Sequence, residues 1–100
     1  MWRATVTAPR AILNPGSPNP VNRVTRIRFT LPEASPVRLA VYDPSGRWIA
    51  TLTEGMRSTG THAVEWRAAD ARGMPLPNGV YVCRLEAGGT SASIKLVVAR

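Results

Sequence analysis

Apolar and polar residues alternate in short runs along most of this chain, and proline or glycine closes nearly every run. In the clearest run, residues 26–31, Ile27, Phe29 and Leu31 alternate with two arginines and a threonine before Pro32. A spacing of two separates side chains onto the two faces of an extended strand, whereas an amphipathic helix needs a spacing of three or four. No helical period lies between the runs, so we expect short β-strands joined by tight turns.

The same alternation predicts about seven strands. They cover residues 2–8, 26–31, 37–42, 47–53, 62–67, 81–85 and 94–98. In the run 47–53, Ile49 and Leu52 are out of phase, which predicts a β-bulge or a local twist. Strands at this spacing around one buried tryptophan, Trp66, predict an all-β fold. We expect an immunoglobulin-like (fibronectin III-like) antiparallel β-sandwich.

Turn chemistry marks the ends of the strands. Asp43-Pro44-Ser45-Gly46 predicts a hairpin turn, because the aspartate can accept a backbone hydrogen bond, Pro44 fixes φ and Gly46 tolerates a positive φ. A second turn of this kind is predicted at Asp70-Ala71-Arg72-Gly73. Residues 9–23 contain four prolines, three asparagines and one glycine, which predicts a linker or an irregular edge segment. We therefore divide the chain into an N-terminal arm, residues 1–13, and a module, residues 14–100.

Composition excludes several classes of protein. No run approaches the ~20 apolar residues of a membrane-spanning helix, and the start of the chain has no signal-peptide pattern, so a signal peptide is expected to be absent or already removed. Cys83 is the only cysteine and is expected to be a buried, unreactive thiol. The net charge of +7, with Arg26 and Arg28 on one strand face, suits an anionic partner such as a surface polysaccharide. A solvated strand face is the simpler explanation, and without interleaved aromatic residues we expect no nucleic-acid binding.

Catalysis and metal binding have little support. His62 is the only histidine, and neither a nucleophile–base–acid set nor a group of metal ligands surrounds it in the sequence. Asp43 and Asp70 suit turn capping better than calcium binding, since neither loop concentrates several oxygen ligands. We expect no enzyme activity, no cofactor and no metal.

Several short motifs then follow one another in a recognisable order. They are Pro18-Asn19-Pro20, Ile27-Arg28-Phe29-Thr30-Leu31-Pro32, Val41-Tyr42-Asp43 with Gly46-Arg47, Gly60-Thr61-His62 with Trp66, Gly79-Val80-Tyr81 with Arg84-Leu85, and Lys95-Leu96-Val97-Val98. As an ordered set, from about Asn14 to Arg100, they resemble two related families of Ig-like modules from secreted bacterial proteins. These are the Ig-like domain of the flagellar hook-capping protein FlgD and the C-terminal sorting domain of type IX secretion.

The resemblance implies a non-catalytic C-terminal module of a protein that is secreted or held at the bacterial cell surface. Its partners would be secretion machinery, an upstream domain or neighbouring subunits. The last strand, residues 91–100, would then carry recognition, and its candidate residues are Lys95, Leu96, Val97, Val98 and Arg100.

Two alternatives remain open. In the first, the chain is a hook-cap-like or filament-forming subunit that assembles through strand edges or through an N-terminal arm containing Trp2, Ala4 and Val6. In the second, Tyr42 and Trp48 form an aromatic platform for a carbohydrate. A cross-strand packing pair is the simpler explanation of these two aromatic residues.

Overall fold

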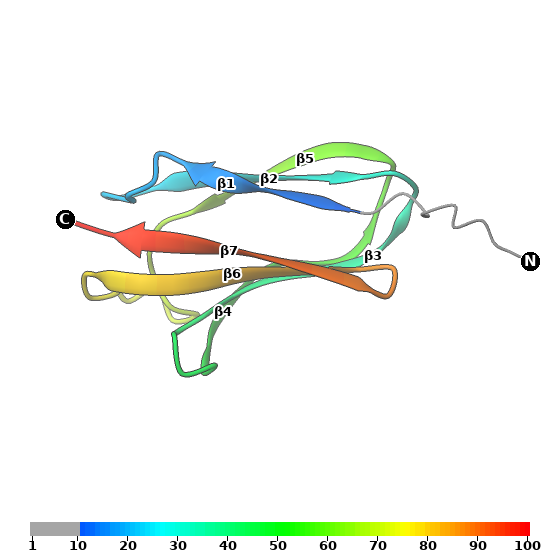
Figure 1. The fold of residues 1–100 in the computed structure, drawn as a ribbon. Helices are drawn as coiled ribbons and strands as arrows, with labels where there is room; N and C mark the ends of the chain where they lie inside the picture. Colours follow the sequence, from blue (N-terminus) through cyan, green and yellow to red (C-terminus); the bar gives the residue numbers. More distant parts are fainter. Residues whose placement is uncertain (1–10) are drawn as a thin grey trace, which may run out of the picture.

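The computed structural model describes residues 11–100 and contains seven β-strands in this part of the chain (Figure 1). They are β1 (Ile12–Ser17), β2 (Thr25–Leu31), β3 (Ser35–Tyr42), β4 (Trp48–Arg57), β5 (Gly60–Trp66), β6 (Gly79–Ala87) and β7 (Thr90–Val98). The strand expected at residues 2–8 lies outside the described residues. Within residues 11–100 no helix is long and apolar enough to cross a membrane.

The strands form two layers. One sheet has the order β1-β2-β5 and the other the order β4-β3-β6-β7, and the paired strands are antiparallel. Figure 1 shows the two sheets stacked face to face, with the turn between β3 and β4 projecting below β6. The predicted all-β, Ig-like sandwich is confirmed.

The core fills the space between the sheets with the inward-facing residue of each alternating pair. Along β2, Thr25, Ile27, Phe29 and Leu31 are buried while the arginines between them are exposed. The largest fully buried side chains are Phe29, Ile27, Leu31, Leu39, Leu85 and Leu96. Both sheets contribute to this cluster, so the hydrophobic effect holds the two layers together.

Residues 12–17, part of the proline-rich segment, form the edge strand β1. This strand pairs with β2, and its register shifts between Asn14 and Ser17. Pro15 lacks an N–H group, and an edge strand tolerates that loss because one side of its backbone needs no partner. The segment is thus an irregular edge strand rather than a linker, and it crosses the boundary that we drew at residue 14.

Two bulges in β4 explain the broken alternation of residues 47–53. Leu39 pairs with Thr53 and Ala40 with Thr51, which leaves Leu52 as the extra residue on β4. Ile49 is the extra residue between the next two pairs. Both side chains pack against the core, so each bulge returns an out-of-phase apolar side chain to the buried face.

Candidate functional site

The segment after β1 closes the open side of the sandwich against β7. The Asn19 amide nitrogen donates to the Lys95 carbonyl oxygen at 3.1 Å, and the Asn19 Oδ1 accepts from the Val97 N–H at 3.0 Å. Val21 then pairs with β7 in parallel, with bonds of 2.6 Å from its N–H to the Val97 carbonyl and 2.9 Å from the Ala99 N–H to its own carbonyl. Asn19 thereby replaces a strand residue with its side chain, which gives the Pro18-Asn19-Pro20 motif a structural role.

Asn19 and Val21, which we call the latch, cover only part of the β7 edge. Lys95 and Val97 direct their backbone groups away from β6 and toward the latch. Because the direction alternates along an antiparallel strand, Ser91 and Ser93 also direct their backbone groups outward. Both serines are exposed, and within residues 11–100 no strand pairs with them on that side. The first half of β7 therefore lacks a hydrogen-bonded neighbour on this side within residues 11–100, although β1 lies close to β7, and we call this unpaired stretch the open edge.

The residues that we expected to carry recognition differ widely in accessibility. Lys95 is exposed on the outer face, whereas Leu96 and Val98 are 0% and 1% exposed and belong to the core. Val97 is half-buried, and its backbone N–H donates a hydrogen bond to Asn19 of the latch. Only Lys95 and the edge beside it offer a surface to a partner. The sequence placed Ser91 and Ser93 within the recognition segment 91–100 without naming them as edge residues, and it did not indicate the role of Asn19.

Arg100, the remaining candidate, is hydrogen-bonded to the loop between β5 and β6. Its guanidinium donates to the carbonyl of Leu76 and, at 3.0 Å, to the carbonyl of Ala68, while its N–H donates to Asn78 Oδ1 at 3.0 Å. These bonds fasten the end of β7 to the long loop between β5 and β6. The side chain is thus engaged within the module.

Replacing Asn19 with alanine is expected to lower the free energy of unfolding by about 1–2 kcal/mol, because two hydrogen bonds to β7 are lost. Water can reach the freed groups of the edge strand, which keeps the loss moderate. Urea denaturation measures the change. Asn22→Ala is the matched control, since Asn22 is exposed and its side chain makes no hydrogen bond within residues 11–100. An equal loss in both variants would contradict the latch.

A tyrosine corner holds the start of β6. The Tyr81 hydroxyl donates to the Pro77 carbonyl at 2.8 Å, and its ring packs edge-on against Trp66 with centroids 6.2 Å apart. Trp66 in turn donates from its indole nitrogen to the Ala69 carbonyl at 3.1 Å. The burial predicted for Trp66 is confirmed, and the corner bond of Tyr81 explains the Gly79-Val80-Tyr81 motif.

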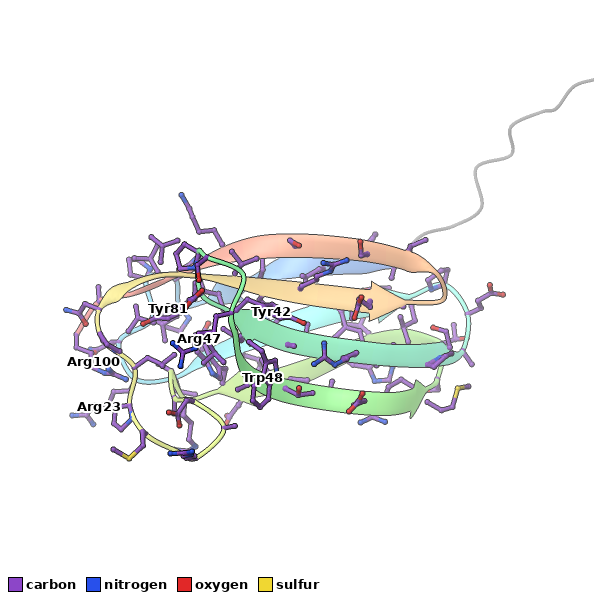
Figure 2. All side chains as sticks on the ribbon, turned by 90° about the horizontal axis from the view of Figure 1, so that it is seen from below. Arg23, Tyr42, Arg47, Trp48, Tyr81 and Arg100 are labelled. Carbon is purple, nitrogen blue, oxygen red and sulfur yellow. The ribbon has the colours of Figure 1, made fainter. Side chains whose placement is uncertain are left out.

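Tyr42 and Trp48 are direct cross-strand partners on the outer face of the second sheet. Arg38 donates to the Tyr42 hydroxyl at 2.7 Å, and this bond is the main reason that the pKa of Arg38 is raised. The Trp48 indole donates to Thr51 Oγ1 at 3.0 Å, which fixes the ring although its residue is 46% exposed. The two aromatic residues lie near each other at the β3–β4 hairpin (Figure 2) and line different depressions, and the common carbohydrate platform stays a prediction.

His62 stacks on Phe29 with ring centroids 5.2 Å apart, and its Nε2 donates to the Ser58 carbonyl at 2.8 Å. These contacts account for the ring by packing and by one backbone bond. Among residues 11–100, no three side chains of histidine, cysteine, aspartate or glutamate gather as metal ligands. The proposed assembly arm, with Trp2, Ala4 and Val6, lies outside the described residues.

Burial in the core raises the pKa of the Cys83 thiol from an ordinary value of 9.0 to about 12. The thiol therefore stays neutral in the folded state while the thiolate forms in the unfolded state above pH 9. We expect the folded protein to react with a disulfide reagent at pH 8 roughly a hundredfold more slowly than in urea. Stability should fall as the pH rises from 9 towards 12. Equal labelling rates with and without urea would show an accessible thiol.

Comparison with known proteins agrees with this architecture. The family model of the FlgD Ig-like domain matches residues 21–91. No curated protein matches the chain.

Two solved structures share the fold. Dimeric latent PorU from Porphyromonas gingivalis superposes with a TM-score of 0.71 at 19% identity, over 96% of this chain and 10% of that one. FlgD from P. aeruginosa superposes with a TM-score of 0.59 at 18% identity, over 89% of this chain and 73% of that one. The family match covers more than half of the chain, and the chain therefore belongs to the FlgD Ig-like domain family.

Proposed function

We propose that this chain is a non-catalytic C-terminal module of a secreted bacterial protein and acts in its secretion, sorting or attachment to the cell surface. The observation that carries the proposal is the partly covered β7. Its second half is closed by the Asn19 latch, while its first half, at Ser91 and Ser93, remains an open edge on a folded sandwich. The fold shared with a part of PorU and the resemblance to type IX sorting domains support this proposal.

Recognition would use the folded module rather than a linear signal. An open sheet edge can accept an additional strand through main-chain hydrogen bonds, and neighbouring side chains provide specificity. At this edge, Lys95 supplies a positive charge at the end of the exposed segment. Leu96 and Val98 would contribute indirectly, because they hold β7 in place from the core.

A reporter protein fused between a signal peptide and the full chain tests the proposal in a bacterium that has a type IX export system. We expect the fusion to reach the cell surface, detected by protease shaving of intact cells. The matched control carries the reporter and the signal peptide alone and should remain in the periplasm. A full fusion that is folded yet remains periplasmic would contradict the sorting function.

A structural subunit is the second candidate, favoured by the family match and by the fold shared with FlgD from P. aeruginosa. In that case the open edge and the arm at residues 2–8 would join neighbouring subunits. Sedimentation of the full chain and of a variant lacking residues 2–8 tests this alternative. Loss of assembly in the variant supports the structural role. A full chain that sediments as a monomer, like the variant, would contradict it.

A further inference from the structure

Two loops of the same chemical design lie side by side at one end of the sandwich. In loop A, residues 43–47, Asp43 Oδ1 accepts from the N–H groups of Ser45 at 2.9 Å and Arg47 at 3.0 Å. In loop B, residues 70–74, Asp70 Oδ1 accepts from the N–H groups of Arg72 at 2.9 Å and Met74 at 3.0 Å.

Each loop contains a glycine turn, and loop B is hydrogen-bonded to β4 close to the end of loop A. Gly46 and Gly73 follow the turns with φ of 90° and 83°, values that a residue with a Cβ rarely adopts. The Ala71 N–H donates to the Ile49 carbonyl at 3.1 Å, so loop B is attached to the start of β4. Hydrogen bonds within each turn hold its backbone, which limits the conformational entropy lost on binding.

Between loop A and loop B lies a cleft of about 450 Å³, within the range of small-molecule sites. Its lining includes Asp43, Arg47, Trp48, Asp70, Arg72 and Leu76. Figure 2 shows Arg47 and Trp48 at the start of β4, next to the loop that follows β5. The cleft therefore joins one exposed indole with groups that donate and accept hydrogen bonds.

The charges in the cleft are not equally available. Each aspartate directs one oxygen into its own turn. The pKa of Asp43 is lowered mainly by the hydrogen bond from the Ser45 hydroxyl, so this carboxylate stays ionised. Arg47 and Arg72 are exposed, and within residues 11–100 neither guanidinium has a hydrogen bond or an ion pair. Asp43 and Asp70 balance the charges of the two arginines within the cleft, and Arg47 also lowers the pKa of Asp43. The unused guanidinium donors and the chain's net charge of +7 favour an anionic ligand.

We infer that this cleft binds an acidic saccharide. The fixed indole of Trp48 offers an apolar face to a sugar ring. Arg47 and Arg72 would bind its carboxylate groups in the planar, paired geometry that guanidinium favours. Single-stranded nucleic acid fits less well, because it needs several aromatic residues along a basic track and Trp48 is the one exposed aromatic side chain that lines this cleft.

Calorimetric titration of the full chain with trigalacturonate at low salt tests this inference. We expect saturable binding to one site, and weaker binding by about tenfold in Arg47→Gln, in Arg72→Gln and in Trp48→Leu. Arg28→Gln is the matched control, because it removes the same charge from an exposed position on the other sheet. It should change the affinity by less than about twofold.

Maltotriose and an oligothymidylate of eight nucleotides serve as comparison ligands. The inference predicts that trigalacturonate binds more tightly than either. It is overturned if trigalacturonate does not bind, if maltotriose or the oligonucleotide binds as tightly, or if Arg28→Gln weakens binding as much as Arg72→Gln. Proton NMR spectra of the variants confirm that each remains folded, so a loss of binding reports on the cleft.

Discussion

Replacing Leu96 with alanine is expected to lower the free energy of unfolding by about 2–5 kcal/mol. The side chain is fully buried in the last strand and belongs to the core cluster shared by both sheets. Alanine would leave a cavity that the rigid layers can close only in part. Since a domain of this size is stable by about 5–15 kcal/mol, this one change removes a large part of the total.

Urea denaturation measures the effect, and Lys95→Ala provides the comparison. Lys95 is the preceding residue and points outward, so its truncation should change stability by no more than about 0.5 kcal/mol. Equal losses in the two variants would mean that β7 is not packed as described. The contrast also shows why deleting the last strand cannot separate recognition from folding.

Replacing Ala68 with valine is expected to lower stability by about 2–5 kcal/mol. Ala68 is 0% exposed and has a φ of 54°, in the left-handed region where a β-branched side chain is strongly disfavoured. Valine would add this backbone strain to overpacking of the core. Thermal unfolding followed by circular dichroism measures the loss.

Ala68→Gly separates the two causes. Glycine adopts a positive φ without strain, which offsets the lost methyl burial and the added flexibility of the unfolded chain. We therefore expect a change within about 1 kcal/mol of the parent protein. A glycine variant as unstable as the valine variant would show that the backbone conformation at this position is not strained.

The fold and its turns could be predicted from the sequence because they depend on local patterns. Alternation gives the strand faces, and the two Asp-x-x-Gly turns carry their hydrogen bonds within a few residues. The bulges of β4 were predictable for the same reason, since Ile49 and Leu52 break the alternation where the extra residues occur.

The features that build the candidate sites depend on contacts between distant segments. Asn19 reaches β7 near the other end of the chain, and nothing in residues 9–23 indicates that a side chain replaces a strand there. Residues 12–17 were ambiguous because proline and glycine suit both linkers and edge strands. The cleft could not be predicted, because it depends on the hydrogen bond between Ala71 and Ile49, two residues that lie far apart in the sequence.

The open edge of β7 is the central claim of the proposed function, and one substitution tests it directly. Ser93→Pro removes an N–H group that points away from β6, so the ladder with β6 keeps its bonds while the edge can no longer accept a strand in full. Ser93→Ala keeps the N–H group and is the matched control. Both variants are measured as reporter fusions in the type IX export assay, after limited proteolysis has shown that each is folded. We expect the Ser93→Ala fusion at the cell surface and the folded Ser93→Pro fusion in the periplasm, whereas equal export of both would contradict recognition through this edge.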